Sequence, residues 1–535
     1  MNKSFLCVAV FLLMIFSSHL SAQILTTSKH PIIIINTDDE DIPDEPKIDA
    51  SMGIIYNGDG LTNSISDPFN QYDGNIGIET RGNSTQGFDK KTYSIELRDA
   101  DNEDLSVDLF GMGAEEDWIL HAMVIDKTQL RIPMSFYLAQ QMGHYASEWK
   151  YVELILNGEY RGLYILVEKI KRDGDRVDIA KLDSDDLAGD SLTGGYILRI
   201  DWTYDIDKDT DGFESAYNSQ ADIPMYFQWY YPKADKIKPQ QAQYIENWIN
   251  TFENALFSND YTNSQGIRYN EYIDLNSFTD FLLINELSKN SDGYKLSSYI
   301  HKDKDSKGGK LVAGPIWDFD QTYGMSRVCS NDDPTGWTYL QNQDECEDLE
   351  SMPLWWQEMM SDELFRNHLK CRWETLRETT FDNDSINNWI DLNVDFISDA
   401  IDRNFTVWDY FIGNSIWIEP EPIPETYEAE IVYMKDWISE RIDWLDANMP
   451  GDCSLVSARF PEMDQGTVRV FPNPVADRVY VEASELIEVN LYSLEGKLLV
   501  FTQENTVDMG ILEPGVYLAQ IVTKQGAVTK KVIKQ

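Results

Sequence analysis

The chain is poor in positive charge, in cysteine and in histidine, and each shortage excludes a class of function. Its 535 residues carry 44 lysines and arginines against 92 aspartates and glutamates, a formal net charge of −48 at pH 7. Such a surface repels phosphate backbones, which excludes nucleic-acid binding. None of the spacings among five cysteines and six histidines resembles a zinc site. His121, between Leu120 and Ala122, is expected to be a packed core residue and not a ligand.

Long hydrophobic runs are confined to the N-terminus. Residues 1–22 contain Lys3, an apolar run from Phe5 to Phe16 and a small-residue end at Ser21-Ala22. This pattern predicts a secretory signal peptide that is too short to remain as an anchor. No later segment reaches the length of a membrane span, so we expect the mature chain to have no transmembrane segment.

Four cysteines remain once the signal peptide, with Cys7, is removed. An even number of cysteines in an exported protein predicts two disulfides, for which three connectivities are possible. We expect one bond to close an acidic insertion and the other to tie the helical region to the end of the body. The expected pairs are Cys329–Cys346 and Cys371–Cys453.

Charge divides the chain into two parts. Residues 468–535 hold seven basic and eight acidic residues, so the excess acidity lies in the preceding body. Aromatic residues make up 12% of the chain, which argues for a folded protein. We therefore expect a body over residues 23–455, a linker over 456–467 and a small all-β sandwich over 468–535.

Periodicity predicts an α+β body. Apolar runs or alternation favour strands at residues 31–36, 76–81 and 92–98, and Asn157-Gly158 predicts a hairpin turn. Helical spacing of apolar residues predominates from residue 240 onward, over 240–255, 275–290, 352–380, 386–403 and 425–448. A β-rich N-terminal half followed by a helical C-terminal half predicts two lobes.

A polar turn between two predicted strands has the composition of a phosphate-binding loop. It begins at Arg81-Gly82-Asn83-Ser84 and ends at Lys90-Lys91. Exposed turn amides and an ammonium group can both face an anion. A simple hairpin is the alternative.

Three aspartates lie at the ends of a second predicted hairpin. If Lys302 pairs with Lys310, antiparallel register places Asp292 opposite Asp320. Asp318 would share a face with Asp320, because strand side chains alternate. Clustered carboxylates repel one another unless a cation lies between them, and oxygen ligands favour Mg²⁺ or Mn²⁺. The alternative is that Asp292 caps a helix end and the other two are turn acids.

The C-terminal segment resembles the sorting domain of the type IX secretion system. The similarity lies in Phe471-Pro472-Asn473-Pro474, in Gly515-Val516-Tyr517 and in the basic end Lys530-Lys531-Val532-Ile533-Lys534. The resemblance implies export through that machinery, as a partner, to the cell surface or beyond. An ordinary appended β-sandwich is the alternative.

The body resembles the CotH family of atypical, kinase-like proteins, from about residue 30 to 450. Besides the two motifs around residues 81 and 90, the similar stretches are 117–120, 156–168, 194–198, 290–294, 314–324 and 372–377. The resemblance implies a two-lobed atypical protein kinase that transfers the γ-phosphate of ATP, with Mg²⁺ or Mn²⁺, to Ser or Thr of an exported protein substrate.

The resemblance also implies a role for particular residues. Asp292 would be the catalytic aspartate, and Asp318 would hold the metal, with Asp320 as a further ligand. The nucleotide-binding set would be Gly82, Asn83 and Ser84 over the phosphates, Lys91 on the α/β-phosphates and Glu168 on the adenine side.

One position departs from the family pattern. Ser297 and Ser298 stand where many family members carry an asparagine suited to a second metal contact, and a hydroxyl is a poorer ligand. Two alternatives therefore stay open: a non-catalytic surface, adhesion or scaffold protein on the same fold, and transfer of AMP in place of phosphate.

Overall fold

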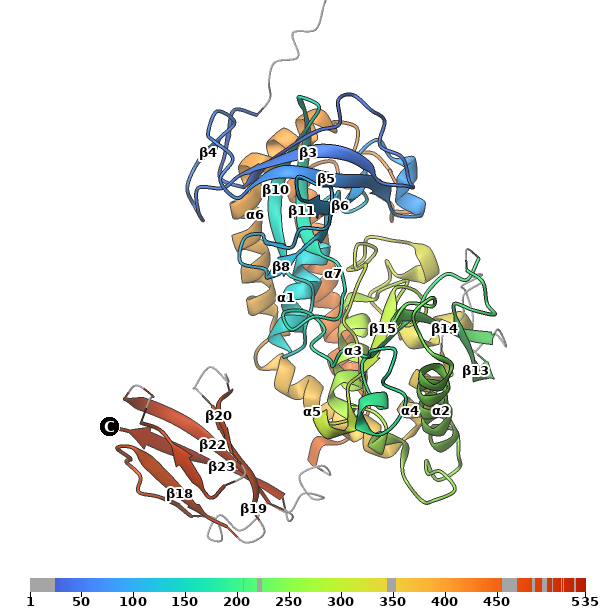
Figure 1. The fold of residues 1–535 in the computed structure, drawn as a ribbon, viewed down its shortest axis with the longest axis vertical. Coiled ribbons are helices and arrows are strands. Elements are labelled where there is room, and N and C mark those ends of the chain that lie inside the picture. The colour runs from blue at the N-terminus through green and yellow to red at the C-terminus, as the bar shows by residue number, and fades with distance from the viewer. Residues whose placement is uncertain are drawn as a thin grey trace, which may run out of the picture. The chain divides into compact units, whose positions relative to one another are not determined.

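The computed structural model describes residues 25–204, 206–218, 224–343, 353–454, 469–483, 486–492, 498–502, 504–510, 512, 514–523 and 526–535 (Figure 1). The expected signal peptide, the expected linker and Cys346 lie outside these residues. The chain forms two compact units: residues 1–362 with 375–449, and residues 363–374 with 450–535.

The first unit begins with a closed seven-stranded barrel, drawn in blue to cyan in Figure 1. Its strands, in barrel order, are β10 (Trp149–Leu156), β11 (Glu159–Glu168), β9 (Asp117–His121), β6 (Thr92–Arg98), β5 (Tyr72–Arg81), β3 (Ile48–Ile55) and β2 (Ile32–Asn36). Inward side chains such as Ile76, Ile95 and Leu166 form its core. The predicted hairpin at Asn157-Gly158 is confirmed: both residues have positive φ, as a tight turn between β10 and β11 requires.

Two short strand pairs accompany the barrel. Strand β1 (Thr27–Ser28) pairs with β4 (Asn63–Ser64), and β7 (Val107–Asp108) pairs with β8 (Ala114–Glu115).

A second sheet of five strands follows along the chain. Its order is β13 (Gly212–Asn218), β14 (Pro224–Tyr231), β12 (Tyr196–Ile200), β15 (Ser298–Lys302) and β16 (Leu311–Ala313). The predicted register of the last hairpin is wrong by one residue, because Lys302 pairs with Leu311 and not with Lys310. Strand β16 ends at Ala313, shortly before Pro315, which has no N–H with which to continue the ladder.

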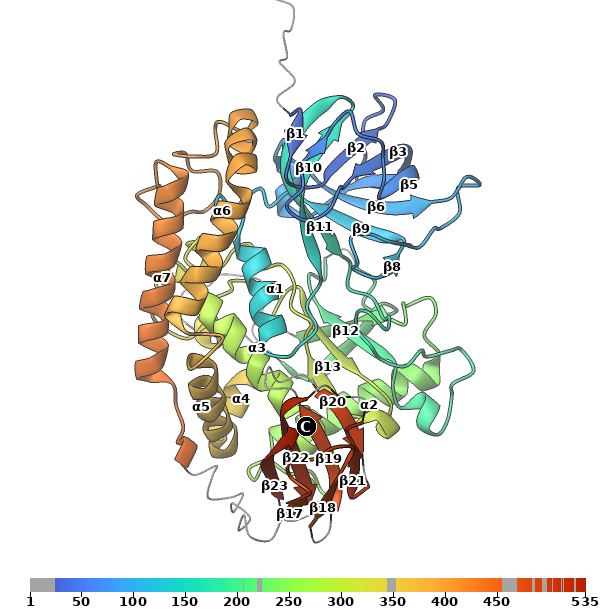
Figure 2. The ribbon, with the colours of Figure 1, turned by 90° about the vertical axis from the view of Figure 1, so that its left-hand side faces the viewer.

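Within the described residues, seven α-helices complete the mixed α/β fold: α1 (Arg131–Gln141), α2 (Pro239–Leu256), α3 (Leu275–Ser288), α4 (Leu354–Ser361), α5 (Glu363–Arg377), α6 (Asn383–Val407) and α7 (Tyr427–Asn448). The single helix predicted over 352–380 is two helices, because the backbone is extended at Asp362. Helix α6 packs against β11 of the barrel and runs beside α7 (Figure 2). The arrangement in two lobes stays a prediction.

In the second unit, the described part of residues 469–535 forms two β-sheets, as predicted for the tail. Strands β17 (Arg469–Phe471), β18 (Arg478–Glu482) and β21 (Thr506–Asp508) form one sheet. Strands β20 (Leu498–Thr502), β19 (Leu486–Tyr492), β22 (Gly515–Thr523) and β23 (Gly526–Lys534) form the other. Valines and isoleucines from both sheets share one core, among them Val479, Val507, Ile521 and Val532.

The two ends of the tail motif meet in this unit. The side chain of Asn473 accepts a hydrogen bond from the Ile533 amide at 2.8 Å and donates to the Lys531 carbonyl at 2.6 Å. The expected Cys371–Cys453 disulfide is present in the same unit. The Cys329–Cys346 pairing stays a prediction, because Cys346 is outside the described residues. Among the described residues, no helix is both long and apolar enough to cross a membrane.

Candidate functional site

A cleft of about 920 Å³ collects most of the predicted site residues. Its walls come from the turn after β5, the ends of β11 and β12, the turn after α3 and the segment after β16. Gly82, Asn83, Ser84, Asp292, Asp318 and Asp320 all line it. Lys91 and Glu168 are not among its lining residues.

The three aspartates reach the cleft through turns. Helix α3 ends where Lys289 adopts φ 49°, and the Asp292 amide then donates to the Asn290 side chain at 3.1 Å. The expectation that strand alternation aligns Asp318 with Asp320 is wrong, since β16 ends at Ala313 and Asp318 has φ 63°. The Ser297 hydroxyl donates to the Asp318 carboxylate at 3.5 Å.

Repulsion among the carboxylates governs the electrostatics of the cleft. The pKa of Asp320 lies well above its ordinary value because of burial, and next because of the charges of Asp318, Asp292 and Asp126. Burial also raises the pKa of Asp318, and Asp201 raises it further, against the opposing effects of Arg81 and Ser297. Asp201, which also lines the cleft, is thus a fourth acid of the site. Negative charges held this close favour a cation between them, so the cluster suits a divalent metal ion.

His121 lies at this cluster, which corrects its assignment to the core. One ring nitrogen of His121 and one oxygen each of Asp318 and Asp320 lie within 4.8 Å of one another. Burial, followed by the Arg81 charge, lowers the His121 pKa to about 3, so the ring is neutral at pH 7. Its Nδ1 accepts a hydrogen bond from the Met123 amide at 3.0 Å, which leaves the proton on Nε2. In this tautomer the ring is a hydrogen-bond donor and not a metal ligand.

Cationic side chains line the cleft, but Lys91, which was predicted to contact the phosphates, is not among them. The Lys91 ammonium donates to the Gln86 carbonyl at 2.5 Å, within the 81–91 turn. Its neighbour Lys90 is buried, with Nζ 2.7 Å from the Leu163 carbonyl. Arg81, Lys169 and Arg199 line the cleft instead. Arg81 stood in a recognised motif, whereas no local signal marked the other two, because strands distant in sequence bring them there.

Glu168 belongs to a buried network outside the cleft. It accepts hydrogen bonds from the Glu148 amide at 2.9 Å and the Tyr145 hydroxyl at 3.1 Å, and Arg176 lies 3.0 Å away. Burial raises the pKa of Glu168 to about 7, against these partners. Successive side chains along a strand point to opposite faces, so the side chain of the next residue, Lys169, points away from this network. It is 37% exposed.

Comparison with known families accounts for both units. A family model described as CotH kinase protein matches residues 78–445. The chain belongs to the CotH family. The match includes the four aspartates of the cleft, Asp201, Asp292, Asp318 and Asp320, and extends into α7.

A second model, the secretion system C-terminal sorting domain, matches residues 469–535. This CotH protein is therefore cargo of the type IX secretion machinery, which carries it to the cell surface or outside the cell. No curated protein matches the chain.

Proposed function

We propose that this secreted CotH protein is an atypical protein kinase that transfers the γ-phosphate of ATP to Ser or Thr of another exported protein. The observation that carries the proposal is the convergence, in one cleft, of three aspartates from the segments after α3 and after β16 with the polar turn after β5. Phosphoryl transfer needs these parts: a metal-binding acid, a carboxylate near the nucleophile and donors for phosphate oxygens.

Asp318 and Asp320 would hold the Mg²⁺ or Mn²⁺. The raised pKa values of both acids support this assignment, because two buried carboxylates that repel one another gain most from a cation. When bound, such an ion neutralises phosphate charge. The His121 ring, a neutral donor beside them, would hydrogen-bond to carboxylate oxygens that the metal does not use.

Asp292 would orient the acceptor hydroxyl and accept its proton. It lies on a turn that begins directly after α3, and its charge reaches Asp320. A position beside the metal ligands, on a separate segment, suits a group that acts on the nucleophile.

The phosphates would lie against the turn after β5. Gly82 has φ 105°, which lets the chain fold back sharply after Arg81. We assign to Arg81 and Lys169 the contact that the family resemblance implied for Lys91, because they line the cleft and Lys91 does not. Lys91 would have to leave the Gln86 carbonyl to reach a phosphate. We propose no direct adenine contact for Glu168, whose carboxylate serves the buried network.

The second candidate is a non-catalytic surface protein on the same fold. It is favoured by Ser297, whose hydroxyl faces Asp318 where the family often has an amide. The scarcity of ATP outside the cytoplasm points the same way.

The test is to incubate the exported chain with γ-labelled ATP and Mg²⁺ or Mn²⁺, next to D318A and D292A. Metal-dependent label on the protein or an acceptor, lost in both variants, would establish a kinase. Label from α-labelled ATP would indicate AMP transfer instead. A folded protein that neither transfers label nor binds ATP would favour the surface protein.

A further inference from the structure

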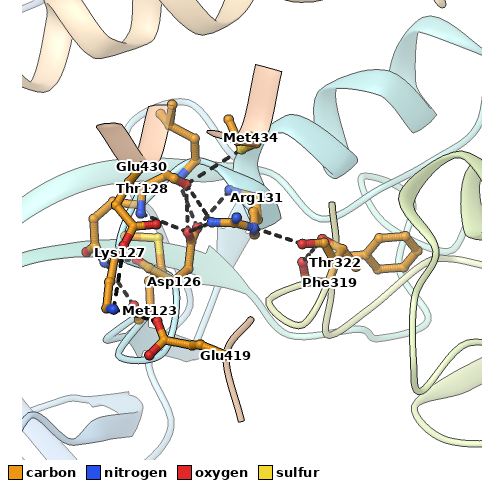
Figure 3. A network of polar contacts seen from close by, with 12 residues as sticks. Met123, Asp126, Lys127, Thr128, Arg131, Phe319, Thr322, Glu419, Glu430 and Met434 are labelled. Atoms are coloured by element: carbon orange, nitrogen blue, oxygen red, sulfur yellow. Dashed lines mark hydrogen bonds and ion pairs between the residues drawn. The ribbon is translucent and has the colours of Figure 1, made fainter. Parts of the chain in front are cut away.

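A buried ion pair lies at the start of α1 (Figure 3). The Arg131 guanidinium donates to the Asp126 carboxylate at 2.6 Å, and both side chains are essentially inaccessible, at 1% and 0% exposure. Neither residue lines the cleft. Removing two charges from water costs free energy that their mutual attraction often does not recover. The Asp126–Arg131 pair therefore suggests a role other than stabilising the fold.

Asp126 holds this arrangement rigidly. One of its oxygens accepts from the Leu130 and Arg131 amides at 3.0 and 2.8 Å, which satisfies the first turn of α1. The other accepts from the amide and hydroxyl of Thr128, at 3.0 and 2.6 Å, as well as from Arg131. With these contacts made, the guanidinium has little freedom to move.

A second nitrogen of the Arg131 guanidinium contacts the turn that carries Asp320. Arg131 Nε donates to the Thr322 carbonyl at 2.8 Å, and the Thr322 hydroxyl donates back to the Phe319 carbonyl at 2.6 Å. These bonds span Asp320, as Figure 3 shows for Phe319 and Thr322. The next residue, Tyr323, donates its amide to the carbonyl of Ser288 in α3 at 2.8 Å. The turn is thus tied to α1 and to the helix that leads into Asp292.

A second buried cation, Lys127, stabilises the segment from Asp126 to Arg131. Lys127 lies 2.6 Å from Glu419 and 3.5 Å from Glu430 of α7, and it donates to the Asn414 carbonyl at 2.7 Å. The segment from Asp126 to Arg131 is therefore also fixed to α7 and to the loop that precedes it (Figure 3).

We propose that Arg131 is a positioning residue for the metal site. It holds the Phe319–Thr322 turn so that the repelling carboxylates of Asp318 and Asp320 stay directed into one cleft. The need is physical: without a rigid scaffold, two like charges separate, and the metal would have to draw them together at the expense of its affinity. The inference rests on the proposed metal role of these acids.

The test compares R131K with wild type in the full chain. Lysine keeps the charge but lacks the planar fork that bonds Asp126 and Thr322 together. The matched control is R403K, which alters another arginine bonded through two nitrogens, at 2.8 and 2.6 Å, to a buried acid, Glu153, away from the cleft. T322V, which removes only the turn-closing hydroxyl, serves as a milder variant if R131K does not fold.

Two readouts are needed, amide hydrogen exchange over residues 316–325 and Mn²⁺ affinity by calorimetry. R131K should lose exchange protection in that segment and bind Mn²⁺ about 10- to 100-fold more weakly, whereas R403K should change neither. T322V should show the same changes at smaller size.

Unchanged protection in R131K would overturn the positioning role. Lost protection with Mn²⁺ affinity equal to that of R403K would overturn its link to the metal site. If wild type binds no Mn²⁺ while R131K still loses protection, the proposed metal site fails and the role in holding the turn stands.

Discussion

Two buried acids of the CotH region, Glu286 and Asp320, lie in opposite electrostatic surroundings. Glu286 of α3 faces Arg441 at 3.1 Å and accepts hydrogen bonds from the amides of Thr338 and Tyr339, at 2.8 and 3.0 Å. Asp320 instead experiences the negative charges of Asp318, Asp292 and Asp126. Burial raises both pKa values, but for Glu286 a cation and two amides oppose the shift, whereas for Asp320 three carboxylates add to it.

The difference separates a structural acid from a binding acid. A fully partnered carboxylate contributes to the fold, and its removal leaves a buried cation without a counter-charge. An acid surrounded by like charges works against the fold, and its presence makes sense if something positive binds there. The predictions below test this division, beginning with the largest expected effect.

Asp318→Ala should lower phosphoryl transfer by roughly 10³-fold, because the acid that holds the metal is lost. The melting temperature of the metal-free protein should stay equal or rise, since one repelling charge is gone. Initial rates with γ-labelled ATP and a thermal melt in EDTA measure the two effects. Retained activity would remove Asp318 from the site.

Glu286→Ala should have the opposite profile, with a loss of about 3–5 kcal/mol in the free energy of unfolding. The guanidinium of Arg441 would be left buried without its carboxylate. Denaturant unfolding of this variant and of Asp318→Ala, side by side, gives the comparison directly. A small loss here would mean that Glu286 is not the structural acid that its partners indicate.

Lys169→Met should raise the KM for ATP by about 10- to 100-fold, whereas Lys91→Met should change it less than about threefold. Lys169 lines the cleft, and the Lys91 ammonium is bonded to a carbonyl of its own turn. Steady-state kinetics on both variants decides between them. The reverse result would return the phosphate contact to Lys91.

Asp320→Asn should stabilise the metal-free protein as pH rises. An acid with a raised folded pKa contributes its stability below the unfolded pKa, near 4, and loses it as pH rises through the folded pKa. Each unit of the pKa shift costs about 1.4 kcal/mol of folding stability once the acid is ionised, and the neutral amide avoids this cost. Melts in EDTA between pH 4 and 8 should show a growing gap in favour of the variant. The same variant should need more metal for activity, and an unchanged requirement would remove Asp320 as a ligand.

Ser297→Asn is expected to give the smallest effect, a roughly three- to tenfold lower metal concentration for half-maximal activity. Ser297 has φ 46°, a conformation that asparagine adopts more readily than most residues, so the change is compatible with the fold. A metal titration of activity measures it. No change would mean that position 297 does not reach the metal.

The sequence by itself determined the elements whose signals are local. Alternation in 76–81 and 92–98 identified barrel strands, and Asn157-Gly158 identified a turn, because each signal depends only on neighbouring residues. The tail motifs identified the sorting domain, and the body motifs identified the CotH family. The acids of the site were also visible, since Asp292, Asp318 and Asp320 lie in two short, polar segments.

Only the tertiary structure decided what surrounds those acids. His121 ends β9, whereas Asp201 and Lys169 directly follow β12 and β11, and the three share a cleft only once the sheets have formed. The family resemblance implied nucleotide contacts for Lys91 and Glu168, yet close partners hold Lys91 in its own turn and Glu168 in a buried network. A local pattern specifies backbone conformation and chemical type, whereas the partner of a charge depends on long-range packing, which no local pattern contains.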